Sequence, residues 1–138
     1  MNRILQRIFF VGVMMVCGVA AHAQTGKYKG DLTIDGYTRN GVVVEFHEKA
    51  GKVDCLLHKV KFSRFMPVTV DMQIKGLQKS VKAKQTYMTG QNIVPMIKNE
   101  PYTKRIVTTF QAVADERHVK MTMTIGDKKT IFVGEKMQ

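Results

Sequence analysis

The chain has 138 residues, a length that suits one folded domain and is too short for two sizeable cores. Its 44% apolar and 24% charged residues are not the composition of a disordered chain, and two cysteines exclude a disulfide-rich miniprotein. The formal net charge of +11 is the unusual value, and it raises the question of an anionic partner.

The first 23 residues have the layout of a secretory signal peptide. Arg3 and Arg7 give a positive start, residues 8–20 form an uncharged apolar run, and Ala21 and Ala23 place small residues two apart. The run is shorter than the roughly 20 residues that a membrane-spanning helix needs. We therefore expect cleavage after Ala23 and an exported protein, either periplasmic or secreted.

The predicted mature domain, residues 24–138, keeps one of the two cysteines and a net charge of +9. Cys17 departs with the signal peptide, so an intramolecular disulfide is not expected. The alternative is a lipoprotein with Cys17 as the lipid-bearing residue, but Val16 before it is too bulky for such a signal. We expect Cys55 to be a small buried apolar residue rather than a nucleophile or a dimerising thiol.

From residue 27 onward, apolar and polar residues alternate with a period of two, which predicts strands with one dry and one wet face. No segment with a convincing helical period and length appears in the mature chain. The eight expected strands lie in residues 27–34, 42–47, 53–58, 68–75, 81–87, 106–112, 119–125 and 130–133.

Two hairpins can be aligned from their turns, at residues 50–51 and 115–116. In both, a two-residue loop brings the apolar faces of the two strands together, whereas a slip of one residue would mix apolar with polar positions. The apolar pairs expected are Val44 with Leu57, Phe46 with Cys55, Ala112 with Val119, and Phe110 with Met121.

The other connections are less well determined. Asp35-Gly36 and Asn40-Gly41 bracket the first turn, since both pairs adopt positive φ angles at low cost. In the last hairpin, a four-residue loop turns Phe132 inward and a five-residue loop turns Ile131 and Val133 inward; both stay open. Residues 89–102 form a long irregular connection that we expect to cross one barrel end.

Successive antiparallel hairpins predict an all-β fold, a single eight-stranded up-and-down barrel, because closure hides every strand edge. An outer-membrane barrel has apolar residues outside and a polar lumen, and the outward lysines here do not fit that arrangement.

Four short motifs resemble the calycin-like, or lipocalin-like, β-barrel proteins exported by Bacteroidetes-type bacteria, a largely uncharacterised family. The motifs are Tyr28-Lys29-Gly30, Asn40-Gly41, the link 62–67 into a Val-x-Val strand, and Phe132-Val133-Gly134. The resemblance implies an eight-stranded barrel related in shape to lipocalins. The chain has no Trp and so lacks the Gly-x-Trp signature of true lipocalins. Ligand binding in a lipocalin-type pocket is implied by analogy of fold.

The inward residues mix aromatics with adaptable Met, and such a lining could pack solid or leave a cup for an apolar ligand. We expect a mostly filled core with a shallow pocket under residues 89–102. The candidate ligand-binding residues of the lining are Tyr28, Phe46, Met72, Tyr87, Phe110, Met121 and Met123. The candidate rim residues are Tyr37, Arg39, Tyr102 and Arg105.

The sequence contains no constellation that predicts catalysis. His47, His58 and His118 fall on polar faces, and their spacing matches no closed metal site. Cys55 is expected to point into the barrel and the three histidines out of it, so these residues are not expected to form a Cys/His dyad. Phosphate-loop and nucleophile-elbow motifs are missing from the sequence. We therefore expect a non-enzyme without a metal or a cofactor.

The positive charge is carried mainly by lysines spread over nearly every strand. Nucleic-acid binding would favour clustered arginines or aromatics on one face, so no nucleic-acid partner is expected. The sequence thus predicts an exported, monomeric barrel that binds a small apolar or amphipathic ligand in its mouth without catalysis. The alternative is an envelope interaction or inhibitor module that acts on an anionic envelope component through its loops and basic exterior.

Overall fold

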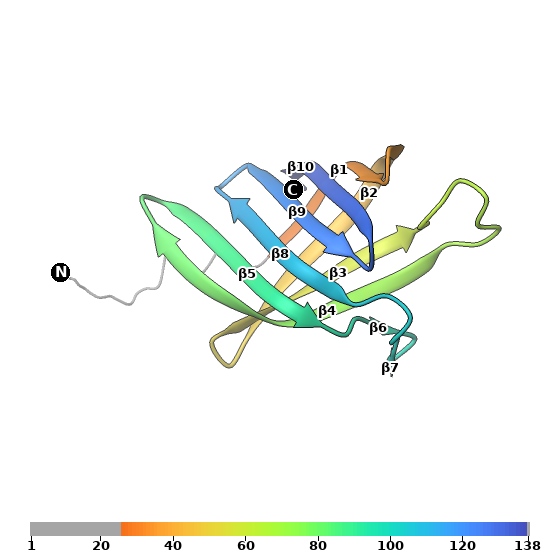
Figure 1. Cartoon of the computed structure of the whole chain (residues 1–138). Helices are drawn as coiled ribbons and strands as arrows, with labels where there is room; N and C mark the ends of the chain where they lie inside the picture. Colours follow the sequence, from red (N-terminus) through yellow and green to blue (C-terminus); the bar gives the residue numbers. More distant parts are fainter. Residues whose placement is uncertain (1–25, 138) are drawn as a thin grey trace.

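The computed structural model describes residues 26–137 as one barrel of β-strands, and these residues contain no helix (Figure 1). The predicted signal peptide and Cys17 lie outside the described residues. Among the described residues, none forms a helix of the length and hydropathy needed to cross a membrane. The strands are β1 (Gly26–Ile34), β2 (Tyr37–Lys49), β3 (Lys52–Val60), β4 (Val70–Lys82), β5 (Gln85–Ile93), β6 (Met96–Ile97), β7 (Glu100–Pro101), β8 (Val107–Ala114), β9 (His118–Ile125) and β10 (Lys128–Lys136).

Eight of these strands form a closed antiparallel barrel. Hydrogen-bonded neighbours follow the order β3-β2-β1-β10-β9-β8-β5-β4, and a further pairing of β3 with β4 closes the ring. Each barrel strand is therefore paired on both sides, which removes the exposed edges of an open sheet. The predicted eight-stranded up-and-down barrel is confirmed.

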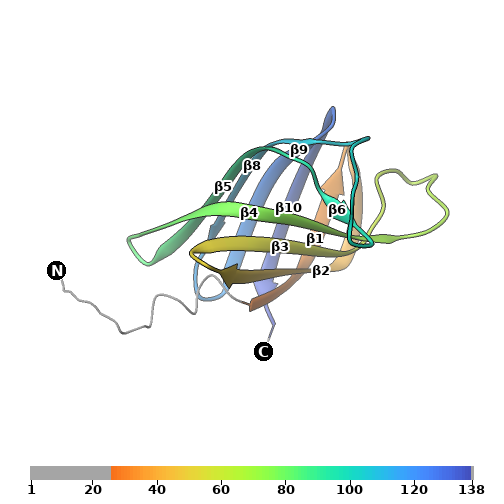
Figure 2. The same cartoon turned by 90° about the horizontal axis from the view of Figure 1, so that it is seen from below.

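The two remaining strands belong to the connection between β5 and β8. β5 runs on to Ile93, and β6 then pairs with the start of β4, where Ile97 faces Met72. Figure 2 shows β6 beside this end of β4 and next to the long loop that joins β3 to β4. The expected irregular crossing thus begins later than residue 89 and contains a short hairpin of its own.

The barrel interior is filled by one continuous cluster of buried apolar side chains. Tyr28 and Phe46 meet edge to face within it, with ring centroids 5.8 Å apart and planes at 75°. The predicted lining residues that lie in this cluster are Tyr28, Phe46, Met72, Phe110, Met121 and Met123.

The inward orientation predicted for Tyr87 is wrong. Thr86 and Met88 are the buried residues of β5, and the Tyr87 hydroxyl donates a hydrogen bond to Gln85 on the outer face. The reason is a tight turn at Ala83 and Lys84, whose φ angles are 54° and 66°. Residues 81–87 therefore belong to two strands, the end of β4 and the start of β5. The turn between them changes which positions face the core.

The register predicted for the β2–β3 hairpin is confirmed, because Val44 faces Leu57 and Phe46 faces Cys55. In the β8–β9 hairpin the predicted faces are correct but the register is wrong by two residues. Phe110 faces Met123 there.

The shift in the β8–β9 register comes from the turn. The Asp115 carboxylate accepts hydrogen bonds from the backbone N–H groups of Arg117 (2.8 Å) and His118 (2.7 Å), which stabilises a longer turn than the expected two residues.

The remaining turns differ in detail from expectation. Asp35-Gly36 forms the first turn, with Ile34 opposite Tyr37, whereas Gly41 lies inside β2 at an irregularity in its pairing with β1. The last hairpin pairs Lys128 with Ile125. Its loop is thus shorter than either alternative, and its buried aromatic residue is Phe132.

Two further strands differ from the prediction in where they begin or which residues they bury. β4 begins at Val70, so Val68 is an exposed loop residue rather than part of the dry face. In β8 the pairing with β9 shifts between Val107 and Thr109, and Val107 is buried there instead of Ile106 or Thr108. An extra residue in one strand reverses the alternation of faces beyond it.

Candidate ligand cleft at the barrel mouth

One end of the barrel, which we call the mouth, carries the longest loops. In an up-and-down barrel alternate connections lie at the same end, so the β1–β2, β3–β4, β5–β8 and β9–β10 connections meet there. Backbone hydrogen bonds join them: Gly126 N–H donates to Ile106 O at 2.7 Å, and Asp35 N–H donates to Lys129 O at 2.9 Å.

A half-open cleft of about 450 Å³ lies at the mouth, between the β3–β4 loop (residues 61–69) and the β5–β8 connection (residues 94–106). Small-molecule sites commonly have volumes of about 300–1,000 Å³, so the cleft is large enough for a small ligand. Its walls are mainly apolar. The lining residues are Phe62, Ser63, Phe65, Met66, Val70, Ile97, Tyr102 and Arg105.

Two stacked aromatic rings form the base of the cleft. Phe62 is 5% exposed and its ring lies parallel to that of Tyr102, with centroids 6.3 Å apart and planes at 1°. Phe62 belongs to the buried core cluster, and Tyr102 packs against it. Tyr102 is held in place by its backbone N–H, which donates to Pro95 O at 2.8 Å. A ligand in the cleft would therefore rest above the filled interior rather than enter it.

A cation lies on the same base. The Arg105 guanidinium carbon is 5.0 Å from the centroid of the Phe62 ring, a cation–π arrangement. Within residues 26–137, neither Arg105 nor Arg64 forms an ion pair with a carboxylate. The Arg105 charge is thus available to an anionic group of a ligand, whose apolar part would contact the walls.

Two of the four predicted rim residues belong to the cleft. Tyr102 and Arg105 line it. Tyr37 lies beside it, with the Arg64 guanidinium 5.7 Å above its ring. Arg39 instead donates a hydrogen bond to the Lys59 carbonyl on the outer wall.

The predicted lining residues do not contact the cleft, because those that point inward belong to the packed core. Sequence reasoning missed Phe62, Met66 and Ile97, although they are apolar residues in connections between strands. Connections between strands are normally exposed and polar, so apolar residues at these positions were the sequence feature that could have indicated the cleft.

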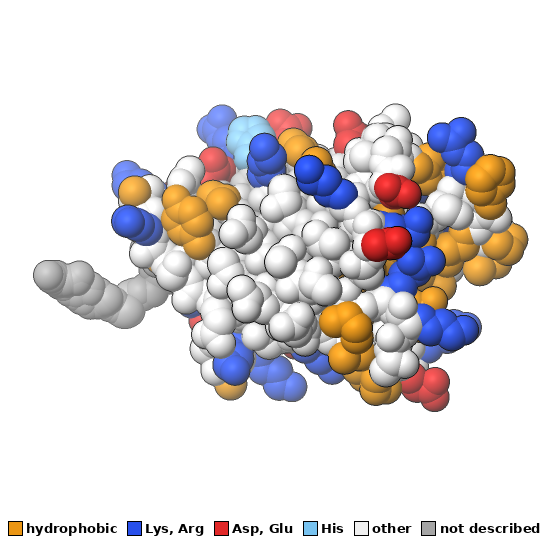
Figure 3. All heavy atoms as spheres, in the orientation of Figure 1, with side chains coloured by type: hydrophobic (Ala, Val, Ile, Leu, Met, Phe, Trp, Pro, Cys, Tyr) orange, Lys and Arg blue, Asp and Glu red, His pale blue; other side chains and the backbone are white. Residues whose placement is uncertain are grey.

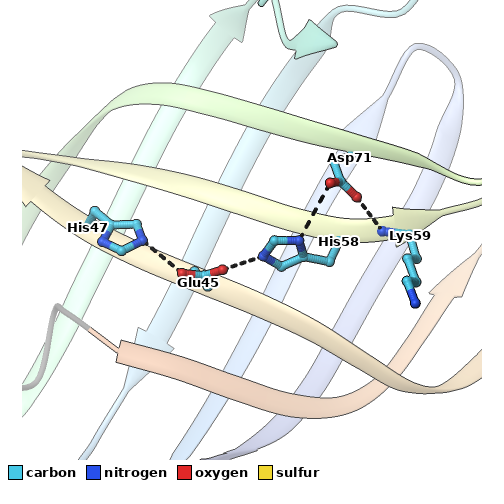
Figure 4. A network of polar contacts seen from close by, with 5 residues as sticks. All are labelled: Glu45, His47, His58, Lys59 and Asp71. Carbon is cyan, nitrogen blue, oxygen red and sulfur yellow. Dashed lines mark hydrogen bonds and ion pairs between the residues drawn. The ribbon is translucent and has the colours of Figure 1, made fainter. Parts of the chain in front are cut away.

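A second group of polar residues lies on the outer wall, across β2, β3 and β4 (Figure 4). The Glu45 carboxylate accepts hydrogen bonds from the Nε2 atoms of His47, at 3.0 Å, and of His58. His58 Nδ1 lies 3.7 Å from an Asp71 oxygen, and the other Asp71 oxygen accepts the Lys59 N–H at 2.9 Å. The network joins three strands through their side chains.

The outer-wall network is not arranged to hold a metal ion, and its members Glu45, His47, His58, Lys59 and Asp71 include no Ser, Thr or Cys that could serve as the nucleophile of a hydrolytic triad. Among the residues that the structure describes, no group of three or more His, Cys, Asp or Glu is arranged to hold a metal ion.

Cys55 of β3 points into the core and is fully buried, and its Sγ atom lies 3.9 Å from Met121 Sδ. Burial, together with the Asp54 charge, raises the pKa of the Cys55 thiol well above its ordinary range.

The fold and the cleft define a closed antiparallel β-barrel with an apolar, cation-bearing cleft at its mouth. No protein-family model, no curated protein and no solved structure matches this chain.

Proposed function

We propose that the protein is an exported, non-catalytic barrel that binds a small amphipathic molecule with an anionic group in its mouth cleft. The observation that carries the proposal is the position of Arg105, which lies on the apolar base of the cleft without a carboxylate partner among residues 26–137. An unpaired guanidinium beside apolar walls is complementary to a ligand with a carboxylate or phosphate head and a hydrocarbon body.

The apolar walls support the second half of this ligand description. Met66, Ile97 and Val70 are partly buried and pack against the core, so their outer surfaces are available to a ligand without rearrangement of the barrel. Met side chains adapt to ligands of different shape because they are unbranched and polarisable. We therefore expect a preference for a class of amphipathic anions rather than for one rigid molecule.

The resemblance to calycin-like exported barrels is in keeping with the proposed binding role outside the cytoplasm. On this proposal, residues 24–138 are the mature protein and act as a monomer without a cofactor.

The proposal is tested with a matched pair of ligands, decanoate and decanol, titrated into residues 24–138 by calorimetry. Both should bind at one site through the hydrocarbon chain, and decanoate should bind at least about tenfold more tightly, since a charged hydrogen bond contributes about 1.5–3 kcal/mol. In Arg105→Gln the advantage of decanoate should disappear, whereas Arg105→Lys should keep part of it.

Arg117→Gln is the control, because Arg117 is an exposed arginine at the opposite end of the barrel. Its affinity for both ligands should equal that of the wild type. Equal decanoate binding by the wild type and Arg105→Gln, or failure of both ligands to bind, would show that the proposed site is wrong.

A further inference from the structure

The β3–β4 loop, residues 61–69, projects beyond the barrel at the mouth, and both views show it standing clear of the strands (Figures 1 and 2). Its tip carries Phe65, which is 87% exposed, and Val68, which is 62% exposed. These are the two most exposed large apolar side chains among the described residues. Exposed apolar side chains gathered at one point commonly mark an interaction site.

Hydrogen bonds within the loop fix this tip in an outward position. The Met66 N–H donates to Ser63 O at 3.2 Å, and the Phe65 N–H donates to Ser63 Oγ at 3.3 Å. The Phe62 N–H points to Met66 Sδ at 3.4 Å. Phe62 and Met66 thus face the barrel, and Phe65 is left on the outside of the same turn.

The base of the loop is positively charged. Lys59, Lys61 and Arg64 lie within or next to it, and the sequence has no acidic residue between Lys59 and Val70. The neighbouring β5–β8 connection adds Lys98 and Lys104, both exposed, against one exposed acidic residue, Glu100. Figure 3 shows hydrophobic and cationic side chains together at this end of the molecule.

We propose that the β3–β4 loop docks the protein on an anionic lipid surface, with Phe65 and Val68 inserted at the level of the headgroups. A protruding apolar tip with several Lys and Arg residues near its base matches such a surface, since apolar groups enter the acyl boundary while Lys and Arg remain at the charged headgroups. The inference is independent of the ligand proposed for the cleft.

The size and shape of the tip favour lipid over a protein partner. An aromatic side chain contributes roughly 150–250 Å² of contact area, whereas a stable protein interface needs about 800 Å² on each side. A convex tip of two apolar side chains falls well short of that area, but insertion into lipid requires no matching concave surface. The open side of the cleft, which Phe65 also lines, would then lie close to the lipid.

The chain has no Trp, so Phe65→Trp gives a single fluorescent reporter at the tip. We expect its emission to shift to the blue on addition of vesicles of phosphatidylcholine mixed with phosphatidylglycerol, and to be quenched by brominated lipid. Vesicles of phosphatidylcholine alone should give a much smaller shift, and added salt should reverse binding to the anionic vesicles because it screens the cations. Val81→Trp is the matched control at the far end, since Val81 is 45% exposed, and its emission should not change.

Cosedimentation with the same vesicles measures affinity without a reporter. Val68→Ser should weaken binding by about tenfold, while Val81→Ser should have no effect. Val68 does not line the cleft, so Val68→Ser should leave decanoate binding unchanged, and this separates failure of the docking proposal from failure of the cleft proposal. Unchanged vesicle binding by Val68→Ser, or an emission from Phe65→Trp that anionic vesicles do not alter, would overturn the lipid-docking proposal and leave a protein as the partner to seek.

Discussion

Gly30 of β1 lies opposite Gly134 of β10 at the seam where the first and last strands close the barrel. A Cβ atom at Gly30 would lie 2.0 Å from Val133 O and 2.5 Å from the Gly134 Cα, distances that no side chain can occupy. At Gly134 a Cβ would meet the buried Phe132 ring at 2.6 Å. The two glycine-ended motifs at the start and end of the domain are therefore parts of one close contact between strands.

The first prediction concerns this seam. Gly30→Ala should destabilise the protein by about 3 kcal/mol, because the methyl group forces the two backbones apart. Gly26→Ala is the control, since its methyl group would meet mainly the flexible end of Lys136. Urea unfolding followed by circular dichroism measures both. Equal stability of the two variants would show that the seam tolerates a side chain.

The second prediction concerns a buried hydroxyl. Thr86 Oγ1 is buried without a hydrogen-bond partner among the described residues, so Thr86→Val should stabilise the protein by about 1 kcal/mol. Thr130 is also buried, but its hydroxyl donates to Lys128 O at 3.4 Å. Thr130→Val should therefore be neutral or destabilising in the same urea titration. A loss of stability in Thr86→Val would mean that the hydroxyl has a partner, such as an ordered water.

The sequence predicted the fold class and most of the core because alternation of apolar residues depends only on local parity. Phe46 and Cys55 could be paired for that reason. Parity cannot reveal an offset of two residues, as in β8–β9, nor a turn inside an apparently continuous strand, as at Ala83 and Lys84.

The cleft was less predictable than the fold. The places of Tyr102 and Arg105 in the chain predict them as rim residues, and both line the cleft. Phe62 and Ile97 come from two connections that meet only in three dimensions, and a single sequence does not report that contact. The projection of Phe65 depends on hydrogen bonds within its loop, which residue types alone do not specify.

The third prediction concerns the reactivity of Cys55. Its thiol is 0% exposed, and burial followed by the Asp54 charge raises its pKa, so the thiolate that reacts with disulfide reagents is scarce. In residues 24–138 at pH 8, Ellman's reagent should not react with the folded protein and should react fully after denaturation. A Val81→Cys variant supplies an exposed thiol as control and should react at once. Rapid reaction of the folded wild type would show that the core opens around Cys55.

The fourth prediction concerns the pH dependence of stability, through Glu45. Burial would raise the pKa of this carboxyl, but hydrogen bonds from His58 and His47 and the charges of His58 and Lys27 outweigh it, so the net pKa lies below its ordinary value of 4.5. A carboxylate with a lowered pKa in the folded state contributes stability that is present above pH 4.5 and is lost as the pH falls through its folded value.

Glu45→Gln should therefore cost about 1 kcal/mol at pH 7, and the difference from the wild type should shrink below pH 4.5 as Glu45 itself becomes protonated. Urea unfolding across this pH range gives both curves. Glu116→Gln is the control, because Glu116 is exposed at the far end and forms no ion pair among residues 26–137. A constant difference between Glu45→Gln and the wild type at all pH values would mean that the amide changes packing rather than charge, and would remove Glu45 as the group that links β2 to β3 electrostatically.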